Sequence, residues 1–222
     1  MAQLLALAMA EWRLKVLLTV VVNVVFWIGY GTLGRHAFYP VREVPMLWLD
    51  RAVPFTPEPW SWVYLSYFLF SAGMPWLLPN RETLRRFAVC VAMLMALSFS
   101  AFFFYPTQVV RPADLGDGVA MNWIVALDGK LNACPSLHAG FIMSMSALAL
   151  RVFAPPCWVV MLCGLWFTAI AYSTLATRQH YSLDLLAGAA VGWFSHWFAW
   201  RGASAAATIS VSNGTMSQLG EK

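Results

Sequence analysis

Residues 87–105 read FAVCVAMLMALSFSAFFFY and contain no charged side chain. An α-helix that crosses the hydrocarbon core of a bilayer needs roughly 20 mostly apolar residues. Because lipid cannot satisfy backbone N–H and C=O groups, a segment inside the core must pair them internally, as a helix does. The stretch therefore predicts a transmembrane helix.

Apolar runs of similar length lie on both sides of this one. The composition agrees, since 60% of the 222 residues are hydrophobic and 11% are charged, against about 25% charged in a typical soluble domain. We therefore expect an all-α, polytopic membrane protein, a six-transmembrane-helix bundle that occupies residues 14–202. The six predicted spans are Leu14–Leu33, Trp60–Leu78, Phe87–Tyr105, Leu137–Phe153, Cys157–Thr177 and Tyr181–Trp200.

The two ends of the chain are predicted to lie outside this bundle. Residues 1–13 make a poor signal peptide, because no Lys or Arg precedes their first apolar run, and are expected to remain as an N-terminal interfacial segment. Residues 203–222 are small and polar, and are expected to form a disordered tail. The net charge of +4 is small and spread along the chain, which gives no case for nucleic-acid binding.

Basic residues in the loops set the expected orientation. The total numbers on the two sides differ only slightly, but Arg81, Arg85 and Arg86 cluster in the short loop after the second predicted span. Because positively charged short loops face the cytoplasm, we expect both termini in the cytoplasm and the loop 106–136 outside it.

Three polar stretches fall on one side of the predicted bundle. They read YPTQVVRPA at 105–113, NACPSLHAG at 132–140 and STLATRQHYSLDLLAG at 173–188. An odd number of crossings separates opposite faces, so all three emerge on the same side, which is extracytoplasmic in the expected orientation. Ionisable residues inside a span are costly and indicate function.

His180 and Asp184 are four residues apart, which places them on one face of a helix. A carboxylate there can accept the proton of one imidazole nitrogen and leave the other nitrogen as a base or nucleophile. The alternative is an ion pair at the membrane edge that holds the helix in register. The neighbouring polar stretches favour the catalytic interpretation.

The stretch that contains PSLH adds a candidate anion site. Pro135 suits the first turn of a helix, and the free N–H groups at a helix N-terminus bind anions. Ser136 adds a hydroxyl and His138 a candidate proton donor. In the alternative interpretation these residues only begin the helix at the interface.

Arg111, Arg178 and Lys130 supply positive charge to the same side. The planar guanidinium suits phosphate oxygens, although each of these cations could instead bind lipid headgroups. With the histidines and Asp184, fixed positive charge fits phosphoryl transfer without a metal.

Three further carboxylates, Asp114, Asp117 and Asp128, lie in the glycine-containing loop 106–136. Their spacing fits no Ca²⁺ loop, and we expect them to be solvated. The sequence therefore predicts neither a metal site nor a cofactor.

These motifs make the sequence similar to the type-2 phosphatidic acid phosphatase superfamily over roughly residues 45–200. That family has the signatures K-x6-R-P, P-S-x-H and S-R-x5-H-x3-D. The matches are Arg111-Pro112 at the end of the first signature, PSLH at 135–138 for the second, and Ser173, His180 and Asp184 for the third.

Two positions depart from the family pattern. Phe104 stands where the first signature has its lysine, and Thr174 stands where the third has its arginine. Arg178 is similar to a basic residue before QHY in the branch that includes inositol phosphorylceramide synthases and their bacterial relatives. The resemblance therefore implies Arg178 as a substitute phosphate clamp, and a bacterial inner membrane as the location.

The resemblance also implies a mechanism, in which His180 attacks phosphorus to form a phosphohistidine, His138 protonates the leaving group and Asp184 orients His180. The expected function is a lipid phosphatase that cleaves a phosphomonoester or pyrophosphate on the extracytoplasmic face. Transfer to an alcohol or a second lipid is the alternative. A non-catalytic lipid-phosphate binder or transporter is less favoured, because the sequence has neither an inverted repeat nor midplane charges in broken helices.

Overall fold

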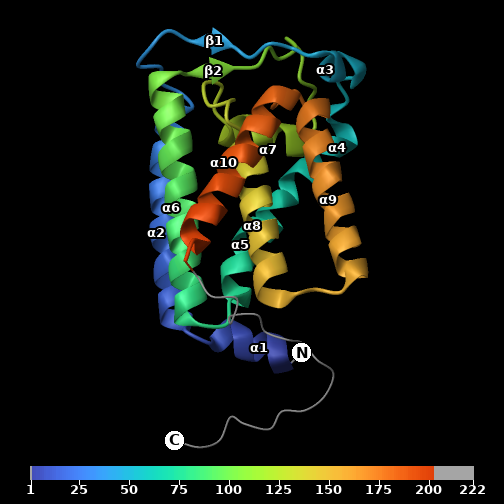
Figure 1. The fold of residues 1–222 in the computed structure, drawn as a ribbon. Helices are drawn as coiled ribbons and strands as arrows, with labels where there is room; N and C mark the ends of the chain where they lie inside the picture. The colour runs from blue at the N-terminus through green and yellow to red at the C-terminus, as the bar shows by residue number, and fades with distance from the viewer. Residues whose placement is uncertain (1, 203–222) are drawn as a thin grey trace, which may run out of the picture.

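Long helices stand side by side in the computed structural model, which describes residues 2–202 (Figure 1). The two strands and α3 lie at one end of the bundle, at the top of Figure 1, with α7 beneath them. The prediction of a mainly helical protein is confirmed. The elements are α1 (Ala2–Met9), α2 (Trp12–Leu33), β1 (Arg42–Glu43), α3 (Trp48–Ala52), α4 (Pro57–Leu65), α5 (Tyr67–Leu77), α6 (Arg81–Phe104), β2 (Thr107–Gln108), α7 (Val119–Leu127), α8 (Leu137–Phe153), α9 (Cys157–Ala176) and α10 (Ser182–Trp200).

Three helices in the described part of the chain, α2, α6 and α9, are long and apolar enough to cross a membrane. Helix α8 is apolar but shorter, with 17 residues. Large apolar side chains on these helices, such as Leu17, Ile28 and Leu165, are more than half exposed. Large apolar side chains exposed in such numbers along these helices are suited to lipid rather than to water.

The second predicted span, 60–78, consists of two helices. Helices α4 and α5 meet at Ser66, whose Oγ donates to the carbonyl of Val63 (2.6 Å) and accepts from the indole N–H of Trp166 (2.8 Å). A serine hydroxyl that bonds back to the preceding turn competes with the main chain and bends helices. The two halves have different neighbours, because α4 packs against α9 and α7, whereas α5 packs against α1, α2 and α8.

Helices α8 and α10 pack in close contact, and glycines permit it. A Cβ atom at Gly188 would lie 2.0 Å from the carbonyl oxygen of Ser136, and one at Gly192 would lie 2.2 Å from that of Gly140. Small residues of this kind let the backbones of two membrane helices approach. The contact holds the beginning of α8 against the first half of α10.

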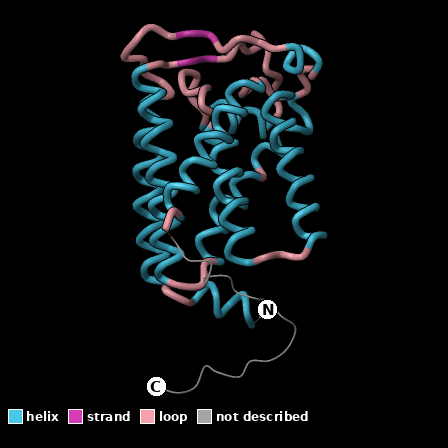
Figure 2. Tube along the Cα trace, viewed as in Figure 1, coloured by secondary structure: helices cyan, strands magenta, loops and turns pink. Residues whose placement is uncertain are grey.

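The longest loops lie at the strand end of the bundle, as Figure 2 shows. Strands β1 and β2 pair in parallel, with Arg42 opposite Thr107, and Thr107 also bridges to Asn132. The predicted loop 106–136 therefore contains secondary structure, namely β2 and α7.

Helix α1 lies at the opposite end, where the Lys15 ammonium donates to the carbonyls of Leu7 and Trp76. These bonds tie the predicted interfacial segment, 1–13, to α2 and α5. The predicted disordered tail, 203–222, lies outside the described residues.

Candidate active site

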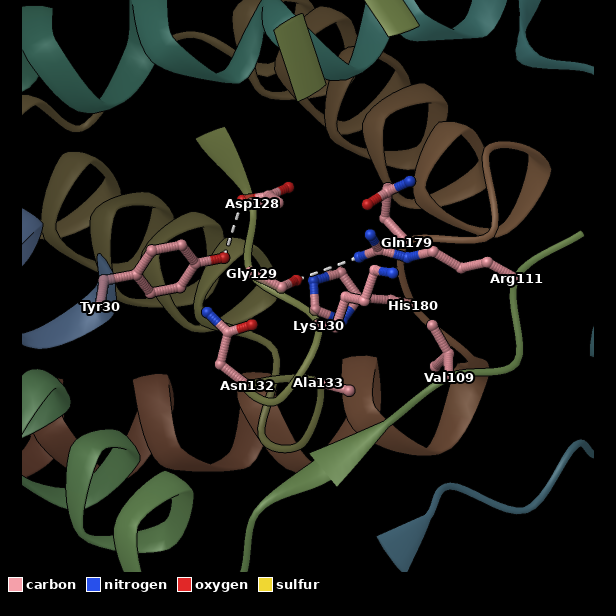
Figure 3. A pocket seen from close by; sticks show the side chains of 10 residues that line it. All are labelled: Tyr30, Val109, Arg111, Asp128, Gly129, Lys130, Asn132, Ala133, Gln179 and His180. Atoms are coloured by element: carbon pink, nitrogen blue, oxygen red, sulfur yellow. Dashed lines mark hydrogen bonds between the residues drawn. The ribbon is translucent and has the colours of Figure 1, made fainter. Parts of the chain in front are cut away.

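The three polar stretches meet at the strand end of the bundle. One contains β2, one begins α8, and one runs from the last turn of α9 into the first turns of α10. A small pocket of about 10 Å³ lies between them, with room for about one water molecule. Figure 3 shows the side chains that line it: Tyr30, Val109, Arg111, Asp128, Gly129, Lys130, Asn132, Ala133, Gln179 and His180.

His180 bonds to Asp184, but the prediction that they share one face of a helix is wrong, because His180 lies in the turn before α10, which begins at Ser182. Its Nδ1 lies 2.8 Å from Oδ2 of Asp184, and both side chains are buried. The other carboxylate oxygen of Asp184 accepts the backbone N–H of Tyr181 at 2.8 Å. Because the carboxylate accepts from Nδ1–H, the lone pair of the ring is on Nε2.

His138 lies beside His180 in the first turn of α8. Its Nδ1 is 3.2 Å from Nε2 of His180, and its Nε2 is 2.9 Å from the hydroxyl of Tyr64. The ring also packs edge-on against Tyr67, with 4.8 Å between the ring centroids. The structure therefore brings the two predicted catalytic histidines into direct contact.

Ser136 supports the backbone at this point. Its Oγ accepts the N–H of Ala139 (3.4 Å) as the N-cap of α8, and its own N–H donates to the carbonyl of Asp184 (2.9 Å). The residue is fully buried and does not line the pocket. A phosphate contact from Ser136 stays a prediction.

Two of the three predicted phosphate-binding cations line the pocket. Arg111, from the loop after β2, donates to the carbonyl of Gly129 at 3.2 Å (Figure 3). Lys130 is exposed, and its ammonium forms no hydrogen bond to another residue within 2–202. The structure therefore places positive charge on the same pocket as His180.

The family model of the PAP2 superfamily matches residues 44–198, which include all three polar stretches. The chain belongs to the PAP2 superfamily. No curated protein and no solved structure gives a significant match. Membership of the PAP2 superfamily implies phosphatase-type activity, and together with the long apolar helices it indicates an integral membrane protein.

The third cation, Arg178, does not line the pocket of this PAP2 superfamily member. Its guanidinium donates to the carbonyls of Asp50 (2.7 Å) and Val53 (2.9 Å). Its backbone has a φ of 54°, in the left-handed region that residues other than glycine seldom adopt. In this position Arg178 joins α3 to the turn between α9 and α10, and its role as a phosphate clamp stays a prediction.

The sequence interpretation of Asp128 as a solvated loop residue is wrong. The carboxylate is half-buried at the end of α7, where Oδ1 accepts from the hydroxyl of Tyr30 (2.8 Å) and Oδ2 accepts from that of Tyr64. Both tyrosines are buried. The available signal was that a tyrosine hydroxyl buried among apolar helices needs a polar partner.

Two amide side chains that were not predicted from the sequence also line the pocket. Asn132 and Gln179 are 4% and 2% exposed, and within residues 2–202 Nδ2 of Asn132 and Oε1 of Gln179 have no hydrogen-bond partner. The Gln179 amide is oriented by its Nε2, which donates to the carbonyl of Thr177 at 3.1 Å. Buried polar atoms in native proteins are almost always paired, so these two atoms indicate a polar ligand or water.

Cys134 is the one thiol in the PSLH stretch. Burial raises the pKa of this thiol to about 11. The thiolate is the nucleophilic form of cysteine, so the side chain is protonated at neutral pH and is no competitor for His180.

Proposed function

We propose that the protein is a membrane-embedded lipid phosphatase that works through a phosphohistidine intermediate. The observation that carries this proposal is the contact between His138 and the His180–Asp184 pair, beside a pocket that Arg111 and Lys130 line. A histidine nucleophile, an orienting carboxylate and fixed cations together suit phosphoryl transfer.

The reaction has two steps. In the first, Nε2 of His180 attacks phosphorus, the bond from phosphorus to the leaving oxygen breaks, and His138 gives that oxygen a proton. Asp184 stabilises the positive charge that the His180 ring gains. In the second, water attacks phosphorus and gives a proton back to His138, while the P–N bond breaks and phosphate leaves.

The pocket supplies charge where the transition state needs it. Arg111 and Lys130 would stabilise the equatorial oxygens of the phosphoryl group, so the proposed reaction needs no metal. Nδ2 of Asn132 would donate to a phosphate oxygen, and Oε1 of Gln179 would accept from the attacking water. Phe104 and Thr174, which occupy the lysine and arginine positions of the family pattern, do not line the pocket.

A cavity between α2, α5, α6 and α8 supports a lipid substrate. It has a volume of about 170 Å³ and a mainly apolar lining, to which Leu18, Val22, Phe26, Phe87 and Phe141 contribute. Tyr67 lines this cavity and also packs against His138. A hydrocarbon chain in the cavity would therefore end beside the proposed catalytic acid.

We further propose six membrane crossings, by α2, the α4–α5 pair, α6, α8, α9 and α10, with the pocket outside. Arg81, Arg85 and Arg86 lie at the beginning of α6, at the end of the bundle opposite the strands (Figure 1). The positive-inside rule assigns that end to the cytoplasm.

Transfer of the phosphoryl-bearing group to an alcohol or a second lipid is the second candidate function. It shares the phosphohistidine step and differs in what resolves the intermediate. The unpartnered Oε1 of Gln179 would accept from an alcohol hydroxyl as readily as from water. The similarity of Arg178 to a basic residue of the inositol phosphorylceramide synthase branch also favours the transferase.

The test uses the full chain in detergent with a panel of lipid phosphates, with and without alcohols, and measures phosphate release and lipid products. We expect phosphate release that survives EDTA and is absent from the His180→Ala variant. A phosphorylated alcohol or a new phosphorylated lipid among the products would favour the transferase. If the protein binds lipid phosphates and forms no product, it is a non-catalytic binder. Full activity of the His180→Ala variant would refute the phosphohistidine mechanism.

A further inference from the structure

One chain of hydrogen bonds joins two carboxylates through both histidines. Asp184 bonds to His180, His180 to His138, His138 to Tyr64, and Tyr64 to Asp128. The three links that involve histidine measure 2.8, 3.2 and 2.9 Å. Asp128 is therefore linked to His138 through one tyrosine, whereas Asp184 is bonded to His180 directly.

The partners of each group assign the hydrogens along this chain. An ionised Asp128 only accepts, so the Tyr64 hydroxyl donates to it and presents its oxygen to Nε2 of His138. Nε2 of His138 therefore carries a hydrogen, just as Nδ1 of His180 carries one toward Asp184. The assignment rests on these partners.

The remaining two nitrogens, Nδ1 of His138 and Nε2 of His180, face each other at 3.2 Å. In neutral rings with the hydrogens assigned above, both nitrogens would present lone pairs. A hydrogen bond between them requires one further proton, shared by the two rings and flanked by two carboxylates. That proton would lie next to His180, which lines the pocket that a leaving oxygen would enter.

We propose that Tyr64 and Asp128 are positioning residues that hold His138 as the acid of the reaction, a role that rests on the proposed phosphatase function. Tyr64 anchors Nε2–H, and the Asp128 charge stabilises the imidazolium through the tyrosine. When the P–N bond to His180 forms and the P–O bond breaks, the proton on Nδ1 of His138 moves to the leaving oxygen. Nδ1 recovers a proton from the attacking water in the second step.

A matched control lies on the same carboxylate. Tyr30 donates to the other oxygen of Asp128 and has no hydrogen bond to His138 within the described chain. Tyr64→Phe and Tyr30→Phe each remove one hydroxyl from Asp128, but only Tyr64→Phe cuts the link to His138. A merely structural role of the Asp128 carboxylate would give the two variants the same kinetic pattern.

The experiment compares two esters in the full chain in detergent: a lipid phosphomonoester, whose alkoxide leaving group needs a proton, and p-nitrophenyl phosphate, whose leaving group does not. We expect Tyr64→Phe and Asp128→Asn to lower kcat/KM on the lipid ester by about 10²-fold, the lower end of general-acid effects, and on the nitrophenyl ester by less than about 10-fold. Tyr30→Phe is expected to change both esters by the same factor.

A second comparison covers variants that fold poorly. If Tyr64 acts through His138, the double variant Tyr64→Phe/His138→Ala loses no more activity than His138→Ala alone. Equal losses on both esters in Tyr64→Phe and Asp128→Asn, or additive losses in the double variant, would overturn the positioning role. Failure of the proposed phosphatase function would give a different result from failure of the positioning role. In that case the wild-type protein would turn over neither ester, or the His180→Ala variant would turn over both.

Discussion

Gly188 is the position where a single methyl group should displace the candidate site. Its Cβ would lie 2.0 Å from the carbonyl oxygen of Ser136, two residues before His138, whereas real Cβ contacts are essentially never under 3.0 Å. The alanine therefore forces the two backbones apart by about 1 Å, which would lengthen the 3.2 Å contact of His138 with His180 by up to the same amount. A 1 Å misplacement costs about 10²-fold in rate, so we expect Gly188→Ala to lower kcat/KM on a lipid phosphate by about that factor.

Stability is expected to fall in the same variant, by the roughly 1–3 kcal/mol that overpacking costs. Gly192→Ala makes a similar clash farther along α10, 2.2 Å from the carbonyl oxygen of Gly140, and should match the loss of melting temperature with a smaller loss of kcat/KM. Gly164→Ala, which has no atom within 4 Å of its Cβ, is the control and should leave both values unchanged or raise stability slightly. Wild-type kinetics and melting temperature in Gly188→Ala would refute the close approach of α8 and α10.

Four further predictions concern the cations, the cavity and the orientation. Arg111→Ala is expected to lower kcat/KM by about 10²-fold, as loss of a donor to developing charge does; unchanged kinetics would remove it from the site. Arg178→Ala is expected to lower stability, because it removes two hydrogen bonds to the α3 segment; a fall in kcat/KM at unchanged melting temperature would instead favour the phosphate clamp. Ala72→Trp fills the apolar cavity and should lower kcat/KM for long-chain lipid phosphates more than for short-chain ones; equal losses would place the chain elsewhere. A cysteine introduced within residues 114–118 should react with an impermeant maleimide in sealed cells, whereas native Cys134 should react slowly at pH 7, because its raised pKa of about 11 leaves little thiolate until the pH approaches that value; labelling of the introduced cysteine only after permeabilisation would reverse the orientation.

Much of the bundle could be predicted because lipid imposes a simple selection on sequence. Long apolar runs must be helical where no water satisfies the backbone. Both ends of α9 and the C-terminal end of α6 lie within one residue of the predicted spans, whereas α6 begins six residues earlier, at the basic turn that starts with Arg81. The break at Ser66 could not be read in the same way. Its Oγ bonds to Trp166, 100 residues away in the sequence, and nothing near Ser66 records that partner.

In the candidate site too, some features depend on local sequence and others on residues far away in the chain. The helix that begins after PS in the PSLH stretch was accessible from local pattern, since Ser136 is the N-cap of α8. The bond between His180 and Asp184 was expected for the wrong reason, because His180 lies in the turn before α10 and not on the helix. Arg178 shows the limit of such patterns, because its spacing from His180 says nothing of the direction of its side chain. The fold directs that side chain to the backbone around α3.

Asp128 makes the strongest case for long-range information. An aspartate in a glycine-containing loop looks the same in sequence whether it is solvated or bonded, and its two tyrosine partners are 64 and 98 residues away. Tyr30 and Tyr64 lie in α2 and α4, so the carboxylate connects three parts of the chain that have no local reason to meet. A hydrogen-bonded carboxylate at the edge of an apolar bundle is retained only if its partners offset the cost of desolvation. Asp128 satisfies that condition through the hydroxyls of Tyr30 and Tyr64. The Tyr64 hydroxyl also contacts His138. The bonds that stabilise the partly buried carboxylate therefore also place its charge near the candidate acid.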